Sequence, residues 1–256
     1  FILCDFYDQT NTNANRETQV EELVQFIEGK HLDVLVKVSD LSDESLSVWL
    51  TKGISGIVVE VSDANEVFDI STRISEIETS KDIPQGTFEM DVILGTAKSI
   101  IDCLIIAQSS PRISSLNLDE RKLYEELDLP FTGEEDALAF SRGRLIVAAR
   151  VAKVQAHGLA FIKSQKDKGS FDEHVELSRK LGFAGAYCKS LGEITFLNKG
   201  FAPSESEYER ALDVIETMEK AFEMGLGAVT LGGSEMIDIA MVRHADNTIF
   251  RHSAVK

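Results

Sequence analysis

Proline, cysteine and long apolar runs are scarce in this chain. Its 256 residues include 4 prolines and 3 cysteines. Helices can run uninterrupted where proline is rare, and the scattered positions of Cys4, Cys103 and Cys188 argue against a disulfide scaffold. The longest apolar stretch, Ile100–Ala107, contains Asp102 and is far shorter than the ~20 residues that a membrane-spanning helix needs. We therefore expect an intracellular protein of a reducing compartment, without a membrane span.

Basic residues are also few relative to acidic ones. The chain has 26 Lys and Arg residues against 43 Asp and Glu residues, and its formal net charge is −17. Such a chain is repelled by nucleic acids and anionic membranes at long range, so we expect neither as a direct partner. The apolar fraction of 43% is ordinary for a globular protein and sufficient for a large core. The length allows one large α/β domain or two small ones.

The sequence has no initiating Met and opens at Phe1 with the apolar stretch Phe1–Phe6. β-Branched and aromatic residues in this stretch predict a buried strand at the very start. We expect that the original start was lost to processing or to disorder. Removal of a targeting segment would place the mature protein in an organelle matrix, that of a plastid or a mitochondrion.

Short apolar runs alternate with amphipathic stretches along the chain. The predicted strands are Phe1–Phe6, Asp33–Val38, Gly56–Val61, Thr87–Leu94, Ile113–Leu118, Ala156–Ile162, Ala184–Tyr187 and Ala228–Leu231. The predicted helices are Arg16–Ile27, Ser42–Thr51, Asp63–Ile77, Thr96–Ala107, Glu134–Ala152, Phe171–Leu181, one starting at the N-cap Ser204, and Ser234 to about His252. This alternation requires right-handed crossovers and a parallel sheet. Seven or eight such units fit a (β/α)8 barrel better than an open sheet, and no Gly-x-Gly-x-x-Gly turn follows the first strand.

Four local features carry more specific expectations. Ser204 and Glu207 have the spacing of a capping box at a helix start. Gly232-Gly233 reads either as a plain turn or as a phosphate-binding turn before the last helix. That helix is apolar almost all round, which suits a subunit contact. In the helix Thr96–Ala107, we expect the inward stripe to comprise Ile100, Ile101, Leu104 and Ile105.

The C-terminal part carries a series of motifs that resembles a known family. LGF-x-G at Leu181–Gly185 is followed by FAPS-x-x-E at Phe201–Glu207, a long helix, and SEMID at Ser234–Asp238. This order resembles citrate lyase β-subunit-like proteins of the HpcH/HpaI aldolase group, which includes malyl-CoA and citramalyl-CoA lyases. The resemblance covers nearly the whole chain and is strongest from Arg144 onward.

The resemblance implies a TIM barrel of the citrate lyase β-subunit type with a C-terminal helical extension. Residues 1–200 would form the barrel body. Residues 201–256 would form the last barrel unit and a C-terminal helical segment of the same domain. In the family, one more strand and helix precede the segment that Phe1–Phe6 occupies here, so the resemblance implies that the first barrel strand would be missing from this sequence.

The resemblance also implies a chemistry and the residues that would perform it. Family members make or break a carbon–carbon bond beside a carboxylate or thioester, with Mg²⁺ held by a Glu and an Asp at successive strand ends and an Arg gripping the carboxylate. Motif matching places Gly95 at the Glu, Lys122 at the Asp and Lys37 at the Arg. Asp238 is the one functional position that is clearly kept. In the family it reaches a neighbouring subunit as an acid or base; its alternative role here is at a helix N-terminus.

Other family elements are altered as well. Tyr7 stands in the acidic pair of Asp5–Asp8, Val59-Glu60 replaces a Pro-Lys pair, and Lys189–Glu193 replaces a His-containing element.

Three functions follow as hypotheses. The favoured one is a pseudoenzyme: a divergent lyase relative with a degenerate metal site and no cofactor, acting as a scaffold or assembly subunit in a homo-oligomer or larger complex. The second is an active carbon–carbon lyase on a CoA ester or short oxo-acid, with Mg²⁺ held by rearranged ligands drawn from Asp5, Asp8 or Glu60. The third is a ligand-sensing barrel in which Lys37 and Lys122 bind a carboxylate.

Overall fold

The computed structural model describes residues 2–5, 13–30, 33–129, 136–159, 171–188, 191–233 and 235–253. The chain forms two compact units, Phe1–Tyr187 (unit 1) and Cys188–Lys256 (unit 2). Each unit has its own secondary structure and core, and each is considered by itself.

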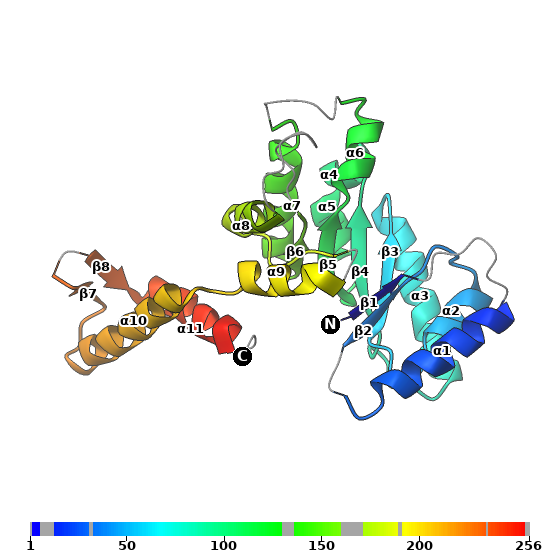
Figure 1. Cartoon of the computed structure of the whole chain (residues 1–256), viewed down its shortest axis with the longest axis horizontal. Helices are drawn as coiled ribbons and strands as arrows, with labels where there is room; N and C mark the ends of the chain where they lie inside the picture. Colours follow the sequence, from blue (N-terminus) through cyan, green and yellow to red (C-terminus); the bar gives the residue numbers. More distant parts are fainter. Residues whose placement is uncertain are drawn as a thin grey trace. The chain divides into compact units, whose positions relative to one another are not determined.

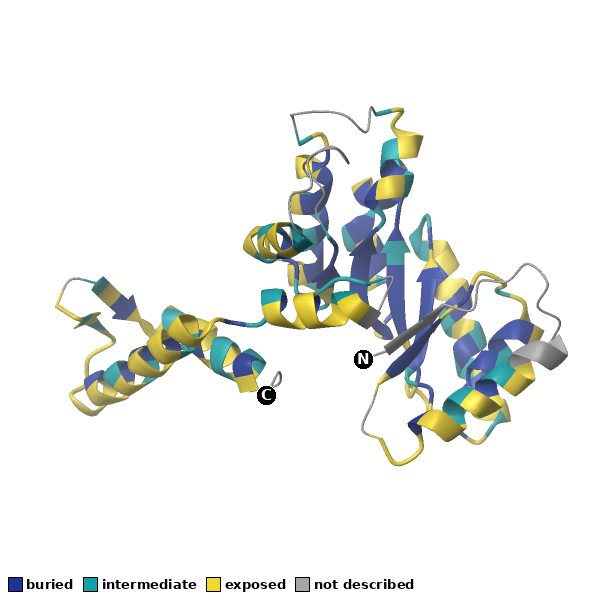
Figure 2. Ribbon diagram, in the orientation of Figure 1, coloured by how far each residue is buried: buried dark blue, intermediate teal, exposed yellow. Residues whose placement is uncertain are grey.

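A six-stranded parallel sheet forms the centre of unit 1 (Figure 1). Its strands are β1 (Ile2–Asp5), β2 (Val34–Lys37), β3 (Gly56–Glu60), β4 (Glu89–Leu94), β5 (Ile113–Leu118) and β6 (Gln155–His157). Their order in the sheet is their order along the chain, and every neighbouring pair is parallel. Strands β2 to β5 are buried over most of their length (Figure 2), as expected for a sheet with both faces covered. This sequential parallel order with outer helices is the arrangement of a TIM barrel.

Helices α1 to α7 of unit 1 lie between successive strands, and α8 follows β6. They are α1 (Asn13–Ile27), α2 (Asp43–Trp49), α3 (Ala64–Ser80), α4 (Ala97–Ile101), α5 (Cys103–Gln108), α6 (Glu120–Glu126), α7 (Ala139–Ala152) and α8 (Phe171–Leu181). Ser42 and Asp63 cap α2 and α3 through side-chain oxygens that accept backbone N–H groups of the first turn. The predicted starts of these two helices are therefore confirmed.

The predicted helix Thr96–Ala107 is wrong in two respects. The chain divides at Asp102 into α4 and α5. Ile101 and Ile105, which we expected to point inward, are 54% and 62% exposed, and the buried side is formed by Ile100, Cys103, Ile106 and Ala107.

Two other segments of unit 1 differ from the prediction. The predicted strand Ala184–Tyr187 is reduced to an isolated parallel bridge between Gly185 and His157. Helix α6 was not predicted at all. The predicted strand Ala156–Ile162 is observed as β6, which ends at His157, while its predicted end lies outside the described residues.

Unit 2 consists of α9 (Leu191–Phe201), α10 (Glu205–Glu223), a hairpin of β7 (Ala228–Leu231) and β8 (Glu235–Asp238), and α11 (Ile239–Ser253). The long helices α10 and α11 pack on each other and on the hairpin. Their small core comprises Ala211, Val214, Met218, Ile237 and Ala245. No helix within the described ranges has the length and apolar character that crossing a membrane requires.

The hairpin corrects two predictions for the C-terminal part. Strand β7 has the predicted bounds, but it pairs antiparallel with β8 instead of joining the parallel sheet. Gly232 and Gly233 have φ values of +60° and +80°, which a hairpin turn requires and which glycine adopts without strain. They are followed by a strand, so the interpretation as a phosphate-binding turn at a helix start is wrong. The last helix begins at Ile239 instead of Ser234, and the segment Leu191–Phe201, for which we predicted neither a strand nor a helix, is helical.

Candidate functional site

The edge of the sheet where TIM barrels carry out chemistry is formed here by the C-terminal ends of β2 to β5, which we call the mouth. Lys37 ends β2 and Glu60 ends β3. Gly95 follows β4, and Asp119 follows β5 and caps α6, which carries Lys122. The structure therefore brings Lys37, Glu60, Gly95 and Lys122 to the same edge, as the parallel topology predicts.

Lys122 occupies the space beside Gly95. A Cβ atom built on Gly95 would lie 3.0 Å from Cδ and 3.1 Å from Cβ of Lys122, and 3.3 Å from Cβ of Asp119. Such distances are tighter than ordinary van der Waals contact, so a larger side chain at residue 95 requires Lys122 to move. From this position Lys122 Nζ forms an ion pair with Glu60 Oε1 across the end of β4.

The other charged groups near the mouth are also engaged with one another. Asp119 Oδ1 accepts the backbone N–H of Lys122 at 3.1 Å. Glu126 Oε1 accepts the N–H of Ala97, at the start of α4, at 2.9 Å. Lys98 Nζ lies 2.9 Å from Asp63 Oδ2, and this hydrogen bond lowers the pKa of Asp63 and raises that of Lys98.

These contacts decide whether the mouth fits the magnesium ion that the fold family implies. Mg²⁺ needs several oxygen ligands in octahedral array. Gly95 has no side chain that could bind a cation. Asp119 caps α6, and Glu60 is paired with the ammonium group of Lys122. Within the described ranges, no three His, Cys, Asp or Glu side chains are grouped so that they could hold a metal ion. The described residues of the mouth therefore do not fit this ion. The side chain of Asp5 and all of Tyr7 and Asp8 lie outside the described part of the chain.

The remaining predicted site residues have clear positions. Lys37 is exposed at the end of β2 and lies in register with Asp5 of β1 and Val58 of β3. Asp238 ends β8 in unit 2, where its Oδ1 accepts the N–H groups of Ala240 at 2.9 Å and Met241 at 3.3 Å. Asp238 thus stands at the N-terminus of α11, the structural role that the sequence offered as the alternative to catalysis.

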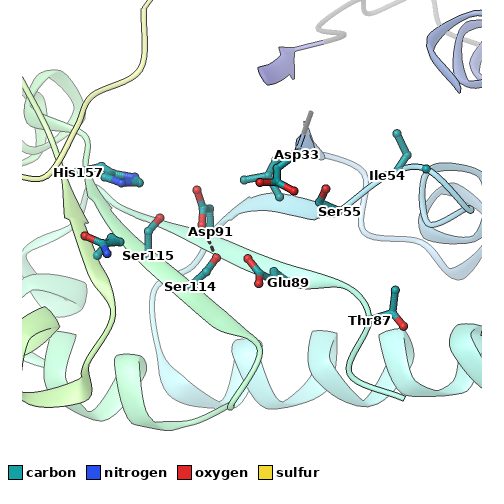
Figure 3. A pocket seen from close by; sticks show the side chains of 12 residues that line it. Asp33, Ile54, Ser55, Thr87, Glu89, Asp91, Ser114, Ser115 and His157 are labelled. Carbon is teal, nitrogen blue, oxygen red and sulfur yellow. Dashed lines mark hydrogen bonds between the residues drawn. The ribbon is translucent and has the colours of Figure 1, made fainter. Parts of the chain in front are cut away.

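A second polar feature, which the sequence analysis did not identify, is a cavity of about 560 Å³ toward the N-terminal ends of β2 to β6. Figure 3 shows its side chains on the face of the sheet opposite the helices. The lining residues are Asp33, Leu35, Gly53, Ile54, Ser55, Thr87, Glu89, Asp91, Ser114, Ser115, Gln155 and His157. The lining contains carboxylates and hydroxyls without Lys or Arg, so it suits groups that donate hydrogen bonds better than it suits anions.

Asp91 is the most deeply buried carboxylate of this cavity, with 2% of its surface exposed. Its Oδ1 accepts a hydrogen bond from Ser114 Oγ at 2.7 Å, and its Oδ2 accepts one from Tyr187 Oη at 3.0 Å. A register shift between β4 and β5 inserts Ser114 as an extra residue, which brings both Ser114 and Ser115 alongside Asp91. Burial and the nearby Asp91 carboxylate raise the pKa of Tyr187, so its hydroxyl stays protonated and can donate.

His157, at the end of β6, lies beside this network. Burial lowers the pKa of its imidazole, and the charge of Asp91 only partly offsets that effect. Its ring meets that of Tyr187 edge-on, with the ring centres 6.3 Å apart. The sequence signal for this network is the occurrence of polar residues, Asp91 in β4 and Ser114 and Ser115 in β5, among the apolar residues of two buried strands.

The sequential parallel sheet, its outer helices and a helical C-terminal part define a TIM-barrel protein whose mouth is lined by paired charges. The family model for HpcH/HpaI aldolase/citrate lyase matches residues 8–190. The chain belongs to this family.

Individual relatives are similar at low identity. Citrate lyase subunit beta of Leuconostoc mesenteroides subsp. cremoris is 24% identical over 235 residues, which are 90% of this chain and 77% of that protein. A citrate lyase structure from Burkholderia xenovorans has a TM-score of 0.73 at 14% identity and covers 98% of this chain and 82% of its own. The CitE protein of Mycobacterium tuberculosis, solved with magnesium, acetoacetate and coenzyme A, has a TM-score of 0.65 at 15% identity and covers 98% and 89%. At such identities the two structures establish the fold alone.

Proposed function

We propose that this chain is a divergent, non-catalytic member of its family that serves as a scaffold or assembly subunit. The barrel architecture is kept, while the residues that would hold a divalent ion at the mouth are replaced. The protein then needs no metal cofactor and no CoA ester substrate, and its task is to bind other protein subunits. The family relatives named as subunits of citrate lyase are consistent with such a role in an assembly.

The observation that carries this proposal is the placement of Lys122. Its ammonium group pairs with Glu60, and its alkyl chain fills the space next to Gly95. A divalent cation brought to this point would have to compete with the Lys122 ammonium for the Glu60 carboxylate, and that ammonium would repel it. It would also gain no carboxylate from residue 95.

The test is magnesium titration calorimetry together with an assay of citramalyl-CoA and malyl-CoA cleavage. We expect no saturable Mg²⁺ binding and no turnover by the intact protein. Lys122→Met is the informative variant, because it removes the ammonium but keeps the chain length that packs beside Gly95. If the protein is a scaffold, this variant stays inactive as well. Cleavage by the unmodified chain that is abolished in Asp238→Asn would overturn the proposal.

The second candidate is an active carbon–carbon lyase for a CoA ester or short oxo-acid, with a displaced magnesium site. It is supported by the register of β1 to β3, which brings the strand ends carrying Asp5, Lys37 and Glu60 side by side. The CitE protein, which has a similar fold, was solved with magnesium, acetoacetate and coenzyme A, and this candidate function would use ligands of these classes. Glu60→Gln separates the two candidates, because it should abolish Mg²⁺ binding only if Glu60 is a ligand.

A carboxylate-sensing barrel is the third candidate and has less support. It would use Lys37 and Lys122 as point charges, but the ammonium of Lys122 already faces Glu60. A thermal-shift screen with di- and tricarboxylates and CoA esters tests it, since a ligand that binds only the folded state raises the melting temperature.

The location of the protein in a reducing compartment, including an organelle matrix, stays a prediction.

A further inference from the structure

The cavity on the face of the sheet opposite the helices has an exposed rim and a buried floor. Asp33, just before β2, and Glu89, at the start of β4, are exposed, and we call them the rim. Asp91 and Ser115 are 2% and 1% exposed, and we call them the floor. Figure 3 shows all four side chains on the same side of the sheet. The volume of about 560 Å³ is in the range of sites for small molecules.

Asp91 places a carboxylate on the floor in contact with neutral groups. Its two oxygens accept hydrogen bonds from the hydroxyl groups of Ser114 at 2.7 Å and Tyr187 at 3.0 Å. Hydroxyl groups carry no charge that could balance a carboxylate. Burial of a charged group is costly unless a group of opposite charge pairs with it. A cation held in the cavity would therefore stabilise this carboxylate.

The protein groups that could supply this positive charge are poorly placed to do so. Among the lining residues that the structure describes there is no Lys or Arg. His157 lines the cavity, but burial lowers the pKa of its imidazole and favours the neutral ring. Lys37 is in the same register row as Asp91, but it lies two strands away and does not line the cavity.

A second observation, independent of the carboxylates, comes from the amide of Asn117. This residue follows Ser115 by two positions on β5, on the same face of the sheet, and its Nδ2 donates to Ser115 Oγ at 3.0 Å. Asn117 is 3% exposed, and its Oδ1 has no hydrogen-bond partner among the residues that the structure describes. A buried acceptor of this kind is uncommon in folded proteins. An N–H donor bound at the floor would satisfy it.

The two carboxylates of β4 set a spacing for the ligand. Glu89 and Asp91 are two residues apart, so their side chains leave the same face of the strand about 6.6 Å apart. A chain of four carbon atoms separates two ammonium groups by about this distance. Leu35 and Ile54 are buried and line the cavity as well, so they offer apolar surface to the alkyl chain.

We propose that this cavity is a binding site for an alkyl diamine with both ends protonated. One ammonium group lies on the floor, where Asp91, Ser115 and Asn117 present oxygen acceptors. The other lies at the rim, beside the carboxylates of Asp33 and Glu89. An ammonium group has three N–H donors and no acceptor, and alkyl amines are protonated at neutral pH as Lys is. The inference does not rest on the proposed function, because the mouth is at the opposite ends of the strands.

The experiment is titration calorimetry of the full-length protein with 1,4-diaminobutane at about 0.15 M salt. Salt at this level screens the general attraction between a chain of net charge −17 and any cation. The comparison ligands are 1-aminobutane, which lacks the second ammonium group, and 1,4-butanediol, which has no charge. We expect saturable 1:1 binding of the diamine, at least about 10-fold weaker binding of 1-aminobutane, and no detectable binding of the diol.

Two variants test the two ends of the site separately. Asp91→Asn should weaken both amines by about 10-fold or more, whereas Glu89→Gln should weaken only the diamine. Asp69→Asn and Glu76→Gln on α3 are the matched controls, because these exposed side chains do not line the cavity and should leave both affinities unchanged. Urea unfolding verifies that each variant is folded. Glu89→Gln keeps the test available if Asp91→Asn does not fold, because residue 89 is exposed.

Absence of saturable 1,4-diaminobutane binding to the unmodified protein would overturn the proposal. Binding of 1,4-butanediol as tight as that of the diamine would overturn it too, since the site would then not select positive charge. Equal losses in the cavity variants and in the α3 controls would have the same consequence, because they indicate only a general attraction of cations to an acidic surface.

Discussion

Lys122 packs so closely against Gly95 that a Cβ atom on residue 95 would lie 3.0 Å from its Cδ. The two residues come from different strand ends, and the ion pair of Lys122 with Glu60 holds the lysine chain across the gap. Residues 95 and 122 are therefore energetically linked. A side chain can be added at residue 95 only if the side chain of Lys122 moves.

The first prediction concerns this link. Gly95→Glu should lower the free energy of unfolding by about 1–3 kcal/mol, because it overpacks a filled space. In a Lys122→Ala background the same substitution should cost clearly less, since the obstructing chain is gone. Urea unfolding of the unmodified protein, Gly95→Glu, Lys122→Ala and the double variant gives the coupling free energy as a double-mutant cycle. Additive effects would show that the two side chains do not compete for one space.

Much of the fold could be predicted from local signals. Strand Ile113–Leu118 has its predicted bounds, and its apolar residues Leu116 and Leu118 alternate with the polar residues Ser115 and Asn117. The capping box also forms as predicted: Ser204 Oγ accepts the N–H of Glu207 at 3.3 Å, and Glu207 Oε2 accepts that of Ser204 at 2.7 Å. Such signals depend on residues close together in sequence.

Features that depend on distant residues were not predictable in the same way. Glu60 and Lys122 are 62 residues apart and meet only because β3, β4 and β5 lie side by side. The register shift that inserts Ser114 beside Asp91 leaves no mark in the apolar pattern. At Gly232-Gly233, the sequence indicated a turn but not the type of turn. A strand following this turn could not be distinguished from a helix, because SEMID is too short for a periodicity.

The second prediction separates structural from catalytic roles of Asp238. Its Oδ1 accepts two N–H groups at the start of α11. Asp238→Ala should therefore cost about 1 kcal/mol of stability, while Asp238→Asn, whose side-chain oxygen can also cap, should cost little. Thermal or urea unfolding measures both. Ser204→Ala at the start of α10 is a matched control, because it removes a cap with no proposed catalytic role.

The third prediction concerns the buried ion pair of Glu78 and Arg112. Arg112 Nη1 lies 2.8 Å from Glu78 Oε1, and Nη2 lies 2.6 Å from Oε2. Burial acts to raise the pKa of Glu78, but the hydrogen bonds from Arg112 and from backbone N–H groups lower it overall. Arg112→Met should cost about 3–5 kcal/mol, because it leaves a buried carboxylate without its cation.

A control variant and a pH dependence test the role of the Glu78–Arg112 ion pair further. Arg121→Met removes an exposed ion pair with Glu125 and should change the stability by less than about 1 kcal/mol. The contribution of Glu78 should be present above its ordinary pKa and disappear as the pH falls through its lowered value in the folded state. If both arginine variants lose similar stability, the burial of the Glu78 pair has no energetic consequence and the prediction fails.

The fourth prediction is a pH dependence that originates at His157. Burial lowers the pKa of this imidazole in the folded protein, so below about pH 6.5 the unfolded chain binds a proton that the folded chain does not. Stability should therefore fall as the pH decreases from about 7 to 5, by at most about 1.4 kcal/mol per pH unit from this residue. His157→Asn cannot bind the proton and should show a shallower dependence over that range. His244→Asn, on the exposed side of α11, should follow the unmodified protein. Carboxylates that titrate at lower pH are common to all three proteins, so the difference between the curves isolates His157. Identical curves would mean that the imidazole is protonated as readily inside the barrel as in water.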